Sequence, residues 1–125
     1  MDKKPVIAIV DDDQSAREGI VDLVSSMGFE AQAFERAEDF LCSHQIACAD
    51  CLITDVRMPG MNGLELLDRL LAAGKPIPAI VLTAFTQEAD RVRALGAGAV
   101  CYMSKPVHES ELMQCIGAAL SSGSL

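Results

Sequence analysis

The sequence has few basic residues, and this shortage excludes one large class of function. Its 10 Lys and Arg residues stand against 18 Asp and Glu residues, which gives a formal net charge of -8. Proteins that wrap nucleic acid bind its phosphates mainly through clustered Lys and Arg side chains. We therefore expect no direct nucleic-acid binding by this chain, and any role on DNA would require another domain.

Long apolar runs are also missing. No stretch approaches the ~20 consecutive apolar residues that a helix needs to span a bilayer. The first residues, 1–5, lead directly into a short apolar run without the pattern of a signal peptide. We therefore expect no membrane contact and a cytoplasmic location.

Paired cysteine motifs of the kind that hold zinc are a third absence. The five cysteines are an odd number, and several of them lie within apolar runs. Cys48 and Cys51 do form a C-x-x-C motif, but Cys51 begins a predicted strand, whereas a redox motif should open a helix. No second pair supplies the two further ligands of a zinc site. We interpret the cysteines as reduced thiols that pack in the core and in loops.

The chain has the length and apolar content of one folded domain. Its 125 residues are 50% hydrophobic, which allows a proper core but leaves no room for two domains. We expect a single domain over residues 1–125, with its core at 5–120 and a frayed tail at 121–125.

Short apolar runs alternate with helical patterns along the whole chain. Strands are predicted at 6–10, 29–34, 51–55, 78–83 and 99–103. Helices are predicted at 15–27, 36–44, 64–71, 87–95 and 109–120. Ser15 and Glu18 have the spacing of a capping box at the start of the first helix. This alternation predicts an α/β fold in which helices cover both faces of a parallel five-stranded sheet, with strand order 2-1-3-4-5.

Reactive side chains follow four of the predicted strands. They are Asp11, Asp12, Asp55, Thr83 and Lys105. Because the carboxyl ends of parallel strands lie at one edge of the sheet, we expect these side chains to meet there. Asp55 ends a buried run and precedes a loop rich in Pro and Gly, so we interpret it as a nucleophile that accepts a phosphoryl group.

Three carboxylates at one edge would repel one another unless a cation were present. A hard divalent cation such as Mg²⁺ takes oxygen ligands and bridges carboxylates to phosphoryl oxygens. Lys105 would add positive charge against the developing phosphoryl charge. Taken one at a time, these residues have plainer interpretations: an acidic helix start for residues 11–13, a turn cap for Asp55 and a surface lysine for Lys105.

Five motifs in this chain resemble those of response-regulator receiver domains, in the CheY-like superfamily. They are Val10-Asp11-Asp12, Thr54-Asp55, residues 58–63, Thr83-Ala84 and Lys105-Pro106. They occur in the family's order and span residues 5–120. The run 55–61 is closest to receivers of the FixJ type. The resemblance implies a (βα)5 flavodoxin-like fold, a three-layer sandwich.

The resemblance also implies roles for individual residues around Mg²⁺, for which Mn²⁺ would substitute. The metal ligands would be Asp12, Asp55 and the backbone carbonyl of Arg57, with Asp11 acting partly through water. A cis peptide bond before Pro106 would aim Lys105 inward. Thr83 would bind the phosphoryl group and Tyr102 would rotate as the switch aromatic. Small Ala84 leaves the site accessible, and Arg57 and Phe85 are expected to tune the loss of phosphate.

The function implied is that of a signalling phosphoacceptor, catalysing only its own phosphorylation and dephosphorylation. A sensor histidine kinase would phosphorylate Asp55, and the switch would control an output, expected to be transcription through a DNA-binding domain outside this chain. Phosphorylation is also expected to favour a homodimer through the fourth helix, fifth strand and fifth helix.

Four alternatives remain open at this point. A haloacid-dehalogenase-type phosphatase would use Asp11 as its nucleophile, but it would need a cap domain and an acidic pair after the fourth strand. A flavodoxin-like cofactor binder would need a phosphate-cradling loop where three acids stand. A receiver that signals without phosphate would not need the reactive residues. A stand-alone receiver would act through protein–protein interaction.

Overall fold

Short, buried, apolar segments form the sheet at the centre of the protein. The computed structural model describes residues 4–44 and 48–122. Its strands are β1 (Val6–Val10), β2 (Glu30–Phe34), β3 (Cys51–Thr54), β4 (Ala79–Thr83) and β5 (Ala99–Ser104). All are parallel, and their order is β2-β1-β3-β4-β5, which confirms the predicted topology. Every residue of β1, β3 and β4 is buried, as expected for strands covered on both faces.

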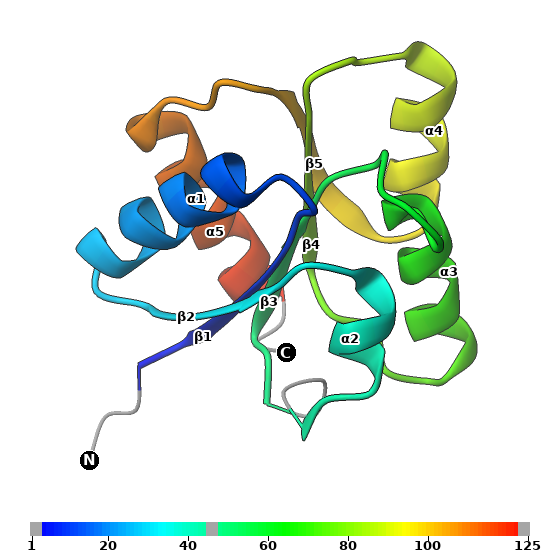
Figure 1. Ribbon diagram of the computed structural model, residues 1–125, viewed down its shortest axis with the longest axis horizontal. Coiled ribbons are helices and arrows are strands. Elements are labelled where there is room, and N and C mark those ends of the chain that lie inside the picture. The colour runs from blue at the N-terminus through cyan, green and yellow to red at the C-terminus, as the bar shows by residue number, and fades with distance from the viewer. Residues whose placement is uncertain (1–3, 45–47, 123–125) are drawn as a thin grey trace.

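Helices cover both faces of this sheet and complete the three layers (Figure 1). They are α1 (Gln14–Ser26), α2 (Ala37–Leu41), α3 (Gly63–Ala72), α4 (Glu88–Gly96) and α5 (Glu109–Ser122). α1 and α5 lie on one face, and α2, α3 and α4 lie on the other. The sheet thus has two apolar cores, one centred on Ile7, Ile53 and Ile116 and the other on Phe40, Leu52 and Leu66. Among the described residues, no helix is long and apolar enough to cross a membrane.

The N-cap of α1 differs from the prediction, and α3 begins with a capping box that was not predicted. The carboxylate of Asp13 accepts a hydrogen bond from the Ala16 N–H at 3.3 Å, so Asp13 is the N-cap of α1 and the predicted cap at Ser15 is wrong. Asp13 keeps an extended backbone, which turns its side chain back toward the first turn. α3 begins with a capping box between Asn62 and Glu65, whose two hydrogen bonds both measure 2.9 Å.

Other boundaries also shift, for reasons of packing. α2 ends at Leu41, three residues before the predicted end at 44. α5 continues to Ser122, so residues 121 and 122 of the predicted frayed tail are helical, while 123–125 lie outside the described residues. Leu71 lies on the exposed side of α3, 45% exposed, because the helix turns Leu66 and Leu70 toward the core.

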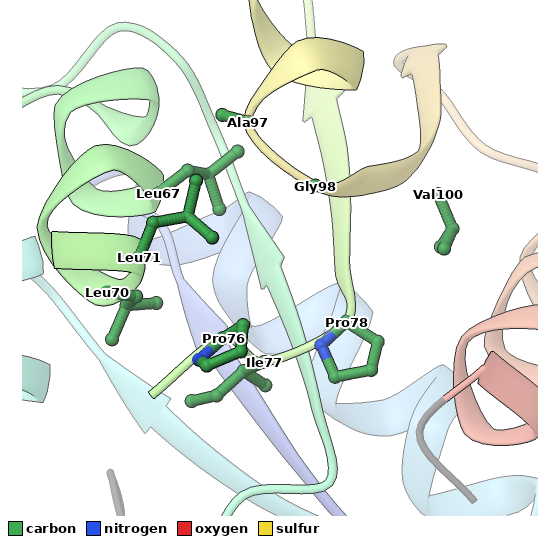
Figure 2. Close-up of a pocket in the computed structure, with 9 residues that line it drawn as sticks. All are labelled: Leu67, Leu70, Leu71, Pro76, Ile77, Pro78, Ala97, Gly98 and Val100. Atoms are coloured by element: carbon green, nitrogen blue, oxygen red, sulfur yellow. The ribbon is translucent and has the colours of Figure 1, made fainter. Parts of the chain in front are cut away.

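A pocket lies at the amino ends of β4 and β5. It has a volume of about 440 Å³, and apolar side chains of α3 and of residues 76–78 line it together with Ala97, Gly98 and Val100 (Figure 2). None of the lining residues is ionisable. This pocket lies at the opposite edge of the sheet from Asp11, Asp55 and Lys105, which follow the carboxyl ends of their strands.

Candidate functional site

Asp55 emerges from the buried centre of the sheet directly after β3. Its N–H donates to the carbonyl oxygen of Val10 at 3.1 Å, so the ladder between β1 and β3 fixes its backbone. Oδ1 of its carboxylate accepts N–H groups from Val56 at 2.6 Å and from Arg57 at 3.4 Å. The side chain is only 11% exposed. The turn after β3 therefore holds this carboxylate in place while leaving it open at one side.

Asp11 and Lys105 complete an ion-pair cluster around Asp55. Lys105 Nζ donates to Oδ2 of Asp11 at 2.6 Å and to Oδ2 of Asp55 at 2.8 Å. Oδ1 of Asp11 accepts the Asp13 N–H at 2.9 Å, and the Asp11 side chain is 2% exposed. The three residues come from the ends of β1, β3 and β5, so the predicted meeting at the carboxyl edge is confirmed for them.

The ammonium of Lys105 is strongly held between the two carboxylates. Burial alone would lower the pKa of Lys105, but the hydrogen bonds to Asp11 and Asp55 outweigh it and raise that pKa above its ordinary value. Lys105 therefore stays charged at neutral pH. The peptide bond between Lys105 and Pro106 is cis, as the resemblance implied.

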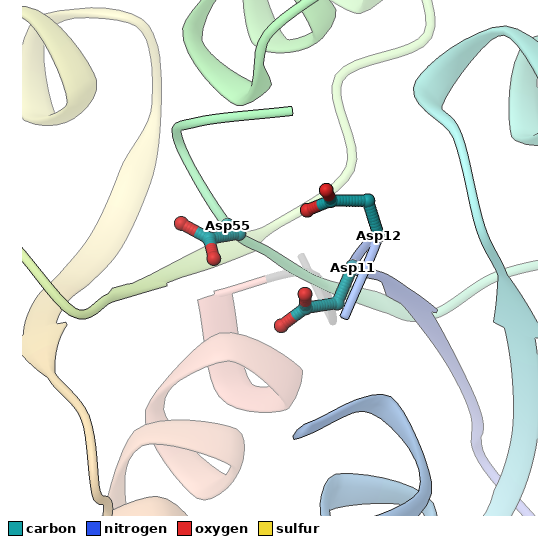
Figure 3. A group of neighbouring side chains, drawn as sticks. All are labelled: Asp11, Asp12 and Asp55. Atoms are coloured by element: carbon teal, nitrogen blue, oxygen red, sulfur yellow. The ribbon is translucent and has the colours of Figure 1, made fainter. Parts of the chain in front are cut away.

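Asp12 joins Asp11 and Asp55 in a group that suits a divalent cation. Each of the three residues offers one carboxylate oxygen, and these oxygens lie within 4.8 Å of one another (Figure 3). Oxygens around one Mg²⁺ ion, each about 2.1 Å from it, lie at comparable separations. Three carboxylates and one ammonium leave a local charge of −2, which a divalent ion would neutralise. The residues present thus fit Mg²⁺, with Asp11, Asp12 and Asp55 as the side chains that would hold it.

Thr83 ends β4 beside this cluster. Thr83 is 1% exposed, and its Oγ1 accepts a hydrogen bond from the Phe85 N–H at 3.4 Å. Its carbonyl oxygen accepts the Lys105 N–H at 2.9 Å, which ties the end of β4 to the segment that carries the lysine. Thr83 is therefore placed at the predicted edge by the same backbone ladder that places Lys105.

Tyr102 connects β5 to the start of α4. Its hydroxyl oxygen accepts the Gln87 N–H at 3.0 Å, and Gln87 is the N-cap of α4. The Gln87 side chain makes no capping hydrogen bond, so the Tyr102 hydroxyl satisfies a backbone donor at that terminus. The partly buried ring packs against the core that α3 and α4 cover.

The predicted tuning residues lie in the loops that follow β3 and β4. Arg57 lies two residues after Asp55, and its guanidinium forms an ion pair with Asp90 of α4 at 3.2 Å. Phe85 is 72% exposed, and Ala84 is also exposed. Arg57 therefore has one contact that sequence reasoning did not identify, a bridge from the Asp55 loop to α4.

Sequence reasoning also missed how the Asp55 loop is held from α2. Oε2 of Glu38 accepts the Met61 N–H at 3.2 Å, and Gly60 adopts φ +75°, a conformation that favours glycine. Hydrogen bonds from backbone N–H groups, including that of Met61, lower the pKa of Glu38. No local pattern relates Glu38 to this loop, whereas Asn62 and Glu65 have capping-box spacing, a signal from which no prediction was made.

Comparison with known proteins decides the family. The family described as the response regulator receiver domain matches residues 7–117. This chain belongs to that family. The match covers β1 through most of α5, so the receiver includes every residue of the site described above.

Curated relatives of this receiver are regulators of about twice its length. It is 40% identical over 119 residues to the response regulator protein TodT of Pseudomonas putida, covering 95% of this chain and 52% of TodT. It is 34% identical over 120 residues to the transcriptional regulatory protein FixJ of Bradyrhizobium diazoefficiens, covering 96% of this chain and 58% of FixJ. The chain thus spans about half the length of these relatives, and FixJ-type relatives are confirmed.

Solved structures give the same result for the fold. The response regulator StyR superposes with a TM-score of 0.89 at 39% identity, covering 98% of this chain and 62% of StyR. FixJ-N superposes with a TM-score of 0.86 at 31% identity, covering 96% of each chain. The chemotaxis protein CheY4 of Vibrio cholerae, at 24% identity and a TM-score of 0.86, covers 94% of this chain and all of CheY4. The CheY-like fold of the receiver is thereby confirmed.

Proposed function

We propose that this receiver accepts a phosphoryl group on Asp55 from a sensor histidine kinase, with Mg²⁺ bound by the acidic cluster. The observation that carries the proposal is the position of Lys105 Nζ, 2.6 Å from Asp11 and 2.8 Å from Asp55. The Asp55 carboxylate is paired with a partly buried ammonium and lies beside two further acids that suit a divalent ion, and phosphoryl transfer needs these groups. That reaction depends on positioning and on positive charge around the phosphoryl oxygens.

The chemistry of the transfer assigns a task to each group. A carboxylate oxygen of Asp55 attacks phosphorus while the bond from phosphorus to the donor breaks, giving an acyl phosphate on Asp55. The Val56 and Arg57 N–H groups and Lys105 orient the Asp55 carboxylate and neutralise charge. Mg²⁺ would be held by Asp11, Asp12, Asp55 and the backbone carbonyl of Arg57, and it would supply Lewis-acid stabilisation of the phosphoryl oxygens.

The conformational switch is part of the same proposal. A dianionic group on Asp55 attracts the Thr83 hydroxyl, and its movement leaves space into which Tyr102 rotates. Rotation of Tyr102 would break its hydrogen bond to the Gln87 N–H at the start of α4. Large apolar side chains are already exposed on the neighbouring helices, at Val92 and Leu95 of α4 and Met113 of α5. We propose this region as the surface for a homodimer or an output domain.

The relatives of this chain support a role in the control of transcription. We propose that residues 1–125 form one receiver domain that acts in the cytoplasm and controls transcription, because relatives such as FixJ are transcriptional regulatory proteins. The DNA-binding function would belong to a separate domain. A stand-alone receiver that acts through protein contacts is the second candidate. The solved chain of the chemotaxis protein CheY4 is covered completely by the match to this chain, so that solved chain has no further domain.

Phosphorylation by acetyl phosphate in Mg²⁺ tests the proposal directly. Asp55→Asn should reduce phosphoryl incorporation at least ~100-fold, because the nucleophile is gone. Asp13→Asn is the matched control: it lies outside the acidic group and Asn caps helices as well as Asp does, so incorporation should persist. Borohydride reduction of the acyl phosphate should convert residue 55 to homoserine.

The same assay distinguishes the phosphatase alternative. If Asp11 were the nucleophile, Asp55→Asn would keep incorporation and the reduced residue would be at position 11. That result would overturn the proposal. No acidic residue stands directly at the end of β4, where the chain reads Thr83-Ala84-Phe85, so the structure offers the phosphatase no second catalytic acid at that strand end.

A further inference from the structure

The loop between β3 and α3 is anchored at its start and at its end by hydrogen bonds within its own segment. At the start, Oδ1 of Asp55 accepts the N–H groups of Val56 and Arg57. At the end, the Asn62 N–H donates to the side chain of Glu65 at 2.9 Å. A contact from another element holds the backbone between these two anchored ends.

Glu38 of α2 provides that contact. Its Oε2 accepts the Met61 N–H at 3.2 Å, although the two residues are 23 positions apart. The same oxygen would lie 2.5 Å from a Cβ placed on Gly60, so the carboxylate fits only against a residue without a side chain. Gly60 also has φ +75°, which favours glycine for a second reason. The loop therefore turns closely around the Glu38 carboxylate.

The position of Glu38 carries a free-energy cost that helix formation does not explain. Its Oε1 is buried and has no hydrogen-bond partner among the described residues, and a buried polar atom without a partner is unfavourable. The first turn of α2 has a second acid, Asp39, which is exposed. Because Asp39 can complement the helix dipole from the surface, α2 does not require the Glu38 carboxylate to be buried. The contact with the Met61 N–H is the feature that this burial secures.

We propose that Glu38 is a positioning residue for the metal site. By holding Met61, it fixes the loop that carries the backbone carbonyl of Arg57. The inference rests on the proposed function, in which that carbonyl is a ligand of Mg²⁺, and it adds α2 to the elements that support the site. Mg²⁺ requires nearly ideal octahedral geometry, so a ligand on a loosely held loop binds it less well. Outer contacts that orient metal ligands typically change affinity ~10-fold or more when they are removed.

Three variants test the role of Glu38. Glu38→Met removes the acceptor and keeps a side chain of similar length, whereas Glu38→Gln keeps an acceptor oxygen without the charge. Asp39→Asn is the matched control, because it removes one acid from the same turn of α2 and leaves the loop contact in place. Urea unfolding identifies the variants that fold. If Glu38→Met does not fold, Glu38→Gln carries the test, because it preserves the shape of the side chain.

The first measurement is amide hydrogen exchange at Met61 in the metal-free protein. Exchange should be about fivefold faster in Glu38→Met, because the hydrogen bond is gone. Glu38→Gln should lie between this variant and the parent, since a neutral acceptor bonds more weakly than a charged one. Asp39→Asn should exchange at the rate of the parent.

The second measurement is the dissociation constant of Mg²⁺ by titration calorimetry. It should rise ~10-fold in Glu38→Met, less in Glu38→Gln and little in Asp39→Asn. The difference should persist in ~0.5 M KCl, where long-range attraction between exposed charges and the ion is screened. Persistence would separate loop positioning from a simple loss of negative charge.

Unchanged exchange at Met61, or faster exchange with the Mg²⁺ affinity of the parent, would overturn the proposal. Equal weakening of Mg²⁺ binding in Asp39→Asn would also overturn it, because charge alone would then account for the effect. Failure of the proposed function gives a different result. In that case acetyl phosphate would leave Asp55 of the parent unmodified, while Glu38→Met would still speed exchange and weaken Mg²⁺ binding.

Discussion

The reactive edge at β1 and β3 and the α4 side of the protein are built in opposite ways. At the reactive edge, Asp11 and Asp55 are buried and share the Lys105 ammonium. α4 buries only Ala94 among its residues, and its links to the site are hydrogen bonds and ion pairs at the surface. The acidic cluster is therefore fixed at the end of the sheet, whereas α4 is joined to it through surface contacts.

The Arg57–Asp90 ion pair and the Tyr102–Gln87 hydrogen bond connect α4 to the loop after β3 and to β5. Both contacts are weak enough to break at a small cost in free energy. The Arg57–Asp90 ion pair is solvent-exposed on the arginine side, where 55% of the side chain is accessible. Such pairs contribute about 0.2–1 kcal/mol. The Tyr102 hydroxyl adds one hydrogen bond to the N-terminus of α4. A phosphoryl group on Asp55 would thus need only a small free energy to release α4, whereas moving the edge itself would disrupt the core.

Gly63→Ala should have the largest effect on stability and on phosphorylation, because the new side chain would displace the backbone next to Asp55. A Cβ at Gly63 would overlap the carbonyl oxygen of Asp55, so the loop or β3 must shift. We expect the free energy of unfolding to fall by about 3 kcal/mol in urea and phosphorylation of Asp55 to be lost.

Gly117→Ala is the matched control for that substitution. Gly117 lies in α5 with open space around its missing Cβ, so alanine should raise the free energy of unfolding by about 0.5–1 kcal/mol. If both variants were equally stable, the reactive edge would not be as rigid as its contacts indicate.

Lys105→Met should come second, since it removes the cation that the two buried carboxylates share. The Lys105 side chain is 18% exposed, so the loss should be about 2 kcal/mol, less than for a fully buried pair. Phosphorylation should slow ~100-fold. Lys105→Arg keeps the charge but changes the geometry, and it should recover stability better than phosphorylation.

The pH dependence provides an independent check on Lys105. Because its pKa is raised in the folded protein, its contribution is fully present below the unfolded value of about 10.4 and is lost as pH rises through the higher folded value. Urea unfolding between pH 9 and pH 11.5 should show this loss in the parent and a smaller one in Lys105→Met. If the free energy of unfolding fell equally with pH in the parent and in Lys105→Met, the raised pKa of Lys105 would be contradicted.

The contrast between the two regions also explains what could be predicted from the sequence. Asp55 and Lys105 follow buried apolar runs, and parallel topology brings such strand ends together wherever the helices lie. The contacts of Glu38 with the Met61 N–H and of Tyr102 with the Gln87 N–H join elements through side chains, and no local spacing encodes them. The cap of α1 was misassigned because Asp13 and Ser15 both suit that role, and only the backbone at Asp13 decides between them.

Thr83→Ala should uncouple the movement of Tyr102 from the phosphorylation of Asp55 while leaving the acidic cluster and α4 folded. The chain has one Tyr and no Trp, so its tyrosine fluorescence reports on Tyr102 alone. Acetyl phosphate with Mg²⁺ should change this fluorescence in the parent. In Thr83→Ala, incorporation should stay within ~10-fold of the parent while the fluorescence change disappears, because the hydroxyl that couples the two is missing. An unaltered fluorescence change would remove Thr83 from the switch.

The smallest effects should come from residues at the mouth of the site. Arg57→Ala and Phe85→Ser should each change the lifetime of the phosphorylated form about threefold, if these side chains control the access of water to phosphorus. Asp90→Asn removes the ion-pair partner of Arg57 and leaves the arginine in place. It should leave the lifetime unchanged if access alone matters. A lifetime that changes equally in Arg57→Ala and Asp90→Asn would instead assign the effect to the bridge to α4, and the surface contact would then influence the chemistry of the buried edge.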